Sequence, residues 1–339
     1  MKDYVKTILI LLIFMFLGGI CYRIFIDNSN IDTKNKNKNK EIIEKNKYPS
    51  YNGYLKVKGT KILNEHNEEF ILKGISSHGI QWFSDLYSKE NLKLLKTNFN
   101  INTFRIAMYT KEGGYIDNPF IKDKVIKMID DLIDLDMYVI IDWHILSDNN
   151  PLMYIDKSKE FFDEISKKYK DKPNLIYEIC NEPNGNTTFD DISKYSNEII
   201  PVIRKNNSKS LIIVGTTDYS KDVDKVIKLN YENILYSLHF YSGTHKEELR
   251  EKLIKALNSN IPVIVSEFGV SDASGNGGVY FDETDKWIRL LKDNSISIIA
   301  WNLSNKNESS AILKENTFKI DDSNLTETGK YLKDIFEKY

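Results

Sequence analysis

The chain has 339 residues, of which 41% are hydrophobic and 28% are charged, so it holds enough apolar material for one large core and is not disordered throughout. With 47 basic and 49 acidic residues, the formal net charge is -2, which gives no reason to expect a nucleic-acid partner. Of the two cysteines, Cys21 lies in an N-terminal apolar run and Cys180 in a predicted buried strand, so no disulfide is expected.

The N-terminal segment, residues 1–27, is typical of a signal peptide or a membrane anchor, because Lys2 and Lys6 precede an apolar run over residues 8–21. The uninterrupted run is shorter than a comfortable membrane span of about 20 residues. However, no Ala-x-Ala cleavage site follows it, which favours an uncleaved anchor that contacts the membrane. Ile20 is a poor residue to precede a lipidated cysteine, so a lipoprotein is a weaker alternative.

Residues 28–50 repeat Lys and Asn and contain few large apolar side chains, so they cannot bury enough surface to fold. This composition predicts a disordered linker. The regular alternation of apolar runs and amphipathic stretches begins only afterwards, which predicts a single catalytic domain over residues 51–339.

A short β-hairpin is predicted first, over residues 54–57 and 61–63, and eight β-strand candidates alternate with helix-length segments after it. Eight such repeats favour a closed (β/α)8 barrel. A doubly wound open sheet is the alternative, but no Gly-x-Gly-x-x-Gly follows the first strand, and Gly275 to Gly278 are better explained as a loop. The strand candidates are residues 70–75, 103–108, 138–142, 175–179, 211–214, 234–238, 263–267 and 297–301.

Polar and aromatic residues gather at the carboxyl ends of these strands, which is where barrel enzymes place their active sites. Each could by itself be a packed or surface group. Two glutamates, an arginine and three histidines around one barrel mouth would be costly to bury without mutual hydrogen bonds or a function. In chain order, the strand ends carry His78 and Trp82, Arg105 and Tyr109, His144, Asn181 and Glu182, His239 and Tyr241, Glu267, and Trp301 with Lys306 and Glu308.

Glu182 and Glu267 lie on different strand ends, and such a carboxylate pair is what glycoside hydrolysis requires. Asn181 is placed to bond the sugar 2-hydroxyl. Arg105 is expected to keep Glu267 ionised, and Tyr241 to donate a hydrogen bond to the same carboxylate. For the remaining positions, we expect His239 and His144 to orient the acid or the sugar, and Trp301 to offer a flat face to a sugar ring.

A metal site is the lesser alternative. Asp142, His144, His78, His239 and Glu267 supply suitable ligand types at strand ends. No His-x-His or His-Glu-x-x-His pair is present, and a metal would leave Asn181, Tyr241 and Trp301 without roles. We therefore expect no metal and no cofactor.

From about residue 51 to its end, the chain resembles the endoglucanases (cellulases) of glycoside hydrolase family 5. The tripeptide Asn181-Glu182-Pro183 is only moderately specific, whereas the complete set of motifs in order is highly specific. Residues 302 and 305–307 depart from the family pattern within the last loop. The motifs lie at residues 74–82, 104–110, 139–147, 176–183, 238–241, 265–269 and 301–310.

The resemblance implies a retaining endo-acting hydrolase of β-1,4-glucans with Glu182 as acid/base and Glu267 as nucleophile. It also implies that Arg105, His144, Asn181, His239, Tyr241 and Trp301 belong to the active site. The positions that resemble the family's substrate contacts are His78, Trp82, Tyr109, Lys306 and Glu308.

Several rivals remain open at this stage. The same machinery could act on mannan, xylan or mixed-linkage glucan, because the fold and the carboxylate pair do not set the sugar. A catalytically inert carbohydrate-binding surface protein and a metal-dependent amidase are further alternatives. We expect a monomer, and an extracellular location because a polymer substrate lies outside the cell, with the chain either anchored at the surface or secreted after cleavage.

Overall fold

The computed structural model describes residues 1, 4 and 47–339. Apart from Met1, Tyr4 and residues 47–50, the predicted signal or anchor (1–27) and linker (28–50) lie outside the described residues. A compact unit spans Tyr48–Tyr339. Residues 48–50, assigned above to the linker, belong to this unit, because the Ser50 hydroxyl donates a 2.6 Å hydrogen bond to Asp136. No helix within residues 1, 4 and 47–339 is long and apolar enough to cross a membrane.

Eight parallel strands close into a barrel in the order β10-β3-β4-β5-β6-β7-β8-β9, which confirms the predicted (β/α)8 fold. A separate antiparallel hairpin, β1 (Lys56–Lys58) and β2 (Lys61–Leu63), confirms the predicted N-terminal hairpin. The barrel strands are β3 (Lys73–Ser77), β4 (Thr103–Tyr109), β5 (Tyr138–His144), β6 (Leu175–Glu178), β7 (Ile212–Val214), β8 (Ile234–Tyr241), β9 (Val263–Gly269) and β10 (Ile298–Leu303).

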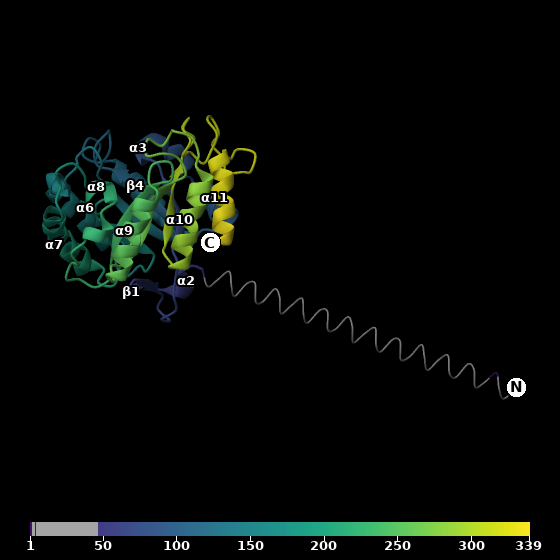
Figure 1. Cartoon of the computed structure of the whole chain (residues 1–339), viewed down its shortest axis with the longest axis horizontal. Coiled ribbons are helices and arrows are strands. Elements are labelled where there is room, and N and C mark those ends of the chain that lie inside the picture. The colour runs from purple at the N-terminus through teal and green to yellow at the C-terminus, as the bar shows by residue number, and fades with distance from the viewer. Residues whose placement is uncertain (2–3, 5–46) are drawn as a thin grey trace. The chain divides into compact units, whose positions relative to one another are not determined.

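Amphipathic helices cover the outside of the barrel (Figure 1). In α5, for example, Ile121, Val125, Met128 and Leu132 recur at helical spacing and are buried. The helices are α2 (Pro49–Asn52), α3 (Ile80–Phe83), α4 (Lys89–Asn98), α5 (Ile121–Asp134), α6 (Ile155–Lys168), α7 (Phe189–Asn206), α8 (Thr217–Ser220), α9 (Glu247–Asn258), α10 (Phe281–Asp293) and α11 (Glu327–Lys338), with 3-10 turns η1 (Ser84–Leu86), η2 (Pro151–Tyr154) and η3 (Val223–Lys225).

The connection from β7 to β8 differs from the expected helix-length segment. It carries only α8 and η3. Within α8, Asp218 and Tyr219 have φ values of 56° and 59°, which is left-handed rather than helical backbone. Left-handed conformations are costly for residues other than glycine, and such strain gathers at functional sites. This connection therefore departs from the barrel pattern close to the mouth where the polar residues collect.

Strand alternation decides which side chains face the barrel interior. In β5, Val139, Ile141 and Trp143 pack outward among the helices, whereas Tyr138 and Ile140 belong to a separate apolar cluster inside the barrel. The hairpin residues Leu55 and Ile62 join that inner cluster. Figure 1 places β1 and α2 at the lower end of the barrel and α3 at the upper end, so the hairpin closes the lower end.

The first barrel strand begins later than predicted. Residues 70–75 were expected to form it, but β3 spans Lys73–Ser77. Phe70 and Leu72 pack in the inner apolar cluster, and the Phe70 amide donates to the Ile62 carbonyl of the hairpin. The apolar run that suggested a strand therefore serves partly to close the barrel floor.

Candidate active site

A cleft of about 580 Å³ opens at the carboxyl ends of the barrel strands. Arg105 and Asn181 are fully buried beside it and do not line it. The other sequence-predicted site residues share this one cleft: His78, Trp82, Tyr109, His144, Glu182, His239, Tyr241, Glu267, Trp301, Lys306 and Glu308.

The two candidate catalytic carboxylates face each other across the cleft. Glu267 lies on β9, and Glu182 follows the end of β6 by four residues. One oxygen of each carboxylate and one ring nitrogen of His239 all lie within 4.8 Å of one another. Retaining glycosidases place their carboxyl groups about 5–5.5 Å apart, whereas inverting enzymes need about 6.5–9.5 Å to admit a water. The spacing fits the retaining geometry.

Two donors hold the Glu267 carboxylate in a fixed orientation. Arg105 Nη1 donates to Oε2 at 3.1 Å, and the Tyr241 hydroxyl donates to Oε1 at 2.6 Å. Burial, together with the negative charges of Glu267 and Glu182, raises the pKa of Tyr241 well above 10, so this hydroxyl keeps its proton. Arg105 and Tyr241 therefore both contact Glu267, and the predicted effect of Arg105 on the charge of Glu267 stays a prediction.

Arg105 is completely buried and organises the floor of the cleft. Besides Glu267, it donates to Glu178 Oε2 at 2.6 Å and to Asn181 Oδ1 at 2.7 Å, and its Nη2 forms an ion pair with Asp142 Oδ2 at 3.0 Å. Burial opposes its charge, but the carboxylates of Asp142, Glu178 and Glu267 outweigh burial, and the pKa of Arg105 is raised. A permanent cation therefore stands directly beside the candidate nucleophile.

A buried hydrogen-bond chain connects Glu182 back to Arg105. His239 Nδ1 donates to Glu182 Oε1 at 2.8 Å, and His239 Nε2 donates to the Ser266 hydroxyl at 3.0 Å. Ser266 in turn donates to Glu178 Oε1 at 2.7 Å. Burial lowers the pKa of His239, but Glu267, Glu178 and Glu182 together raise it to about 10, so His239 is a cation with both ring nitrogens donating.

His144 is neutral, in contrast to His239. Burial and the charge of Arg105 lower the pKa of His144 to about 3. Its Nδ1 lies 2.6 Å from Asp142 Oδ2, and its Nε2 lies 3.3 Å from Asn181 Nδ2. These contacts require Nδ1 to donate and Nε2 to accept. Asn181 is thus engaged with Arg105 and His144, and its predicted contact with a sugar hydroxyl stays a prediction.

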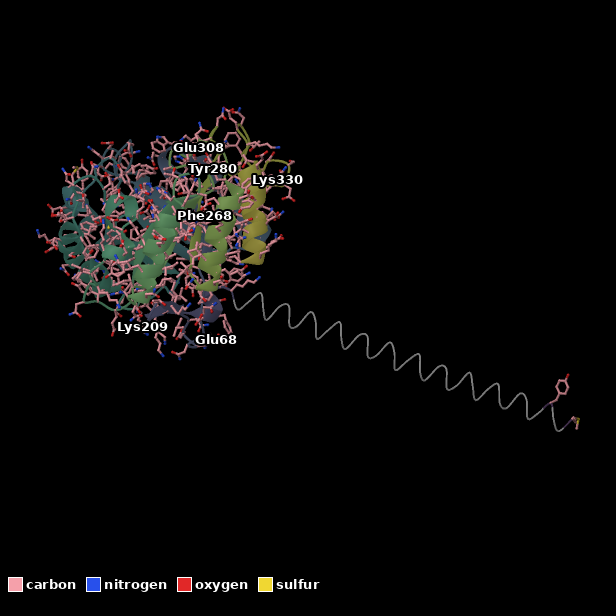
Figure 2. The ribbon with its side chains drawn as sticks, in the orientation of Figure 1. Glu68, Lys209, Phe268, Tyr280, Glu308 and Lys330 are labelled. Carbon is pink, nitrogen blue, oxygen red and sulfur yellow. The ribbon has the colours of Figure 1, made fainter. Side chains whose placement is uncertain are left out.

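Aromatic rings line one arm of the cleft, which extends over the ends of β3 and β10. The Trp301 ring stacks on His144 with 5.6 Å between centroids, and the His78 ring lies 5.1 Å from that of Trp301. Burial lowers the pKa of His78 to about 4, so it is neutral. Lys306 Nζ pairs with Glu308 Oε2 at 2.6 Å on the rim. Figure 2 shows Glu308 at the upper end of the barrel.

The opposite arm consists of residues that the sequence did not indicate. Tyr219, Lys221, Thr244 and His245 line the cleft next to Glu182. The Tyr219 amide donates to the carbonyl of Pro183, which anchors this arm to the loop that carries Glu182. These residues lie in the segments that follow β7 and β8, and no sequence motif marks them.

Glu178 and Ser266 were also missed, although one signal could have found them. Each lies within a strand, at a position that alternation directs into the barrel. A charged side chain inside an otherwise apolar strand is costly to bury unless it is paired. Glu178 in the run from Leu175 to Cys180 is such a case, and the Arg105 guanidinium and the His239 ring lower its pKa to about 2 despite its burial.

The metal alternative does not fit the contacts. Glu182, His239 and Glu267 are close enough to share an ion. However, both oxygens of Glu267 accept from Arg105 and Tyr241, and both nitrogens of His239 already have partners. An ion bound there would lie beside a buried guanidinium and would have to displace these donors.

Known proteins carry the same fold and sequence pattern. The profile of the cellulase family, glycosyl hydrolase family 5, matches residues 63–307. The chain belongs to glycosyl hydrolase family 5. This confirms the resemblance noted from the motifs, and it makes the chain a glycoside hydrolase by family.

Among related members of the family, an endoglucanase of Clostridium saccharobutylicum is 47% identical over 291 residues, which cover 84% of this chain and 65% of the relative. Endoglucanase A of Evansella cellulosilytica is 48% identical over 246 residues, which cover 71% of this chain and 50% of the relative. The chain therefore spans about half to two thirds of the length of these two relatives. The catalytic domain of Thermobifida fusca endoglucanase Cel5A, solved with cellotetraose, superposes with a TM-score of 0.82 at 32% identity, covering 85% of this chain and 99% of that domain.

Proposed function

We propose that this family 5 glycoside hydrolase is an endo-β-1,4-glucanase that cleaves its polymer with retention of configuration. The observation that carries the proposal is the close carboxylate pair, in which Glu267 is held by Arg105 and Tyr241 while Glu182 is held by His239. Two carboxylates in such different surroundings can take the two different roles that double displacement requires.

In the first step, an oxygen of Glu267 attacks the anomeric carbon while the glycosidic bond breaks. Glu182 delivers its proton to the departing oxygen, so the leaving sugar departs as a neutral alcohol. Arg105 and Tyr241 orient the attacking carboxylate beforehand. The product of this step is a glycosyl ester of Glu267.

In the second step, Glu182 takes a proton from a water, and that water attacks the same carbon from the side the leaving group occupied. Glu267 leaves as a carboxylate and again accepts from Arg105 and Tyr241. Two inversions at one carbon give net retention. His239 holds Glu182 through both steps, because its Nδ1–H can donate to either form of that carboxyl.

The relatives support β-1,4-glucan as the substrate class. The two sequence relatives are endoglucanases by name, and the Thermobifida fusca domain was solved with cellotetraose. The cleft extends on both sides of the carboxylate pair, with Trp82 and His78 on one arm and Tyr219 and His245 on the other. Lining residues on both sides of the carboxylate pair suit internal cleavage of a long chain.

The enzyme is extracellular in this proposal, because its polymer substrate cannot enter a cell, and residues 1–27 serve as its signal or anchor. It works as a monomer in this proposal. A membrane-fraction blot of cells that express the chain with and without residues 1–26 tests the anchor. Equal recovery of both forms in the culture medium contradicts it.

The deciding experiment measures reducing ends released from carboxymethylcellulose by the wild type, Glu182→Gln and Glu267→Gln. Each substitution should lower kcat by about a hundredfold or more while leaving the fold intact. Glu248→Gln, an exposed carboxylate in α9, is the matched control and should retain full activity. Mannan and xylan assayed in parallel identify the sugar, and NMR of the first product tests retention. Polymer binding with no turnover by the wild type contradicts the proposal.

A further inference from the structure

A second cavity adjoins the catalytic cleft. It has a volume of about 300 Å³, and Trp82 and Lys306 line both it and the cleft. Leu86 and Phe318 lie on its walls, together with the side chains of Asn305 and Asn307. Because two residues are shared, a chain-like ligand that leaves the cleft past Trp82 enters this cavity directly.

The two walls of the second cavity are tied together by one buried side chain. Asn91 of α4, which is 5% exposed, donates to the Leu86 carbonyl at 3.0 Å and to the Phe318 carbonyl at 2.8 Å. Asn305 also donates to the Thr317 carbonyl at 2.9 Å. At its base, the loop that carries Phe318 is closed by the bridge between Leu313 and Leu325. The backbone at Phe318 is therefore fixed before any ligand arrives.

Phe318 is nevertheless 58% exposed, and Trp82 is 49% exposed. A single exposed apolar side chain needs no explanation. Here, however, two exposed aromatic residues line the same pre-organised cavity. Asn305 and Asn307 line it too, so the cavity combines aromatic and amide side chains. Aromatic faces stack on the apolar faces of pyranose rings, and amides satisfy the hydroxyls at the ring edge.

The position of Glu182 decides which end of the substrate reaches this cavity. Glu182 protonates the leaving oxygen, so the leaving, reducing-end part of the polymer lies on the side of Glu182. Tyr219 is tied to that side, since its amide donates to the Pro183 carbonyl. The arm with His78, Trp82 and Lys306 is the opposite one, and it must hold the non-reducing part.

We infer that the cavity between Trp82 and Phe318 is an outer subsite that binds a glucosyl residue of the non-reducing part of the polymer, beyond the residues held in the catalytic cleft. The inference rests on the proposed function for its ligand class. The enzyme should therefore favour substrates long enough to reach Phe318.

The test uses the full chain and 4-nitrophenyl β-glycosides of cellobiose, cellotriose, cellotetraose and cellopentaose. We expect kcat/KM of Phe318→Ala to match the wild type on the cellobioside and to be about fivefold lower on the longest substrates, as expected for a lost ring contact. Phe318→Trp should restore the wild-type dependence on length. Phe120→Ala, which removes another exposed ring, at the start of α5, is the matched control and should change nothing.

An equal loss on all lengths, or no loss on any, would overturn the subsite. If the wild type cleaves none of these glycosides, the proposed activity fails, and binding then decides the subsite separately. Cellopentaose titrated against wild type and Phe318→Ala is followed by tryptophan fluorescence. Weaker binding by the variant supports the subsite, and equal binding refutes it.

Discussion

The upper and lower halves of the barrel interior are built from the same strands but differ in chemistry. In the lower half, Tyr138 and Ile140 of β5 pack with Ile176, Leu235 and Ile264 of other strands in an apolar cluster. In the upper half, the next inward positions carry Asp142 on β5, Glu178 on β6 and Ser266 on β9, and the buried Arg105 forms ion pairs with Asp142, Glu178 and Glu267. Figure 2 shows Glu308 at the upper end, with Glu68 and Lys209 at the lower end.

One strand can therefore contribute to stability at its lower end and to the active site at its upper end. The apolar lower half stabilises the barrel through burial, at about 25 cal/mol per Å² of apolar surface. The upper half buries charges that are costly unless each has a partner, and Arg105 and His239 supply those partners. Changes in the lower half should therefore reduce stability alone, whereas changes in the upper half should reduce activity first.

Arg105→Met should give the largest effect, because it leaves the carboxylates of Glu178 and Glu267 without their shared cation. We expect kcat/KM on carboxymethylcellulose to fall by about a hundredfold or more. The free energy of unfolding should fall by about 3–5 kcal/mol, since an uncompensated buried charge remains. Urea denaturation and reducing-end assays measure the two quantities.

Arg250→Met is the control for that experiment. Arg250 is a buried residue of α9 that pairs with Glu247 and Glu283 and does not line the cleft. It should retain full kcat/KM. Wild-type activity in Arg105→Met would contradict the role assigned to the buried guanidinium.

Ile140→Ala tests the lower half. Ile140 is fully buried in the inner apolar cluster, so its truncation should lower the free energy of unfolding by about 2–5 kcal/mol. The activity per folded molecule at 25 °C should not change, because no cleft residue contributes to that cluster. Ile227→Ala, which alters a side chain that is 69% exposed, should leave both quantities near wild type. A large loss of activity at unchanged stability in Ile140→Ala would show that the two halves are not separable.

The sequence predicted the barrel well, because eight short apolar runs alternate with helix-length segments. It also indicated the residues that the structure gathers in one cleft, because polar side chains at parallel strand ends must meet at one mouth. The start of the first barrel strand was predicted wrongly, because apolar residues before it pack in the core without belonging to the strand. Phe70 and Leu72 pack in the barrel floor, so a run that looked like a strand begins before β3.

Residues that act through other residues were harder to find. Glu178 ends β6 and Ser266 lies inside β9, and both are linked to the candidate acid/base only through His239. The position of Tyr219 in the cleft depends on the left-handed backbone over residues 218–220. The sequence from Thr217 to Lys221 does not predict that conformation. Such features follow from the packing of loops, which periodicity does not encode.

The smallest expected effect concerns pH and tests whether the buried chain beneath the upper half is functional. The folded-state pKa of His239 is raised to about 10 from an ordinary value near 6.5, so its charge is present below that range and is lost as pH rises towards 10. Glu178→Gln removes one of the charges that raises it. The alkaline limb of the kcat/KM profile should then move about one unit to lower pH, with the acid limb unchanged.

Ser266→Ala separates this effect from the loss of the Arg105 contact. It breaks the hydrogen-bond chain between His239 and Glu178 but leaves the ion pair of Glu178 with Arg105 intact. The alkaline limb should move in the same direction by a smaller amount, because 3.8 Å still separates His239 Nε2 from Glu178 Oε1 and the two charges still attract. Ser271→Ala controls for the loss of a hydroxyl, because Ser271 is a buried serine just after β9 whose hydroxyl donates to the Asp272 carbonyl. If Ser266→Ala lowers the rate but leaves both limbs of the pH profile at their wild-type positions, Ser266 has only a packing role. A displaced alkaline limb would mean that the hydrogen-bond chain sets the charge of His239 and, through it, the orientation of Glu182.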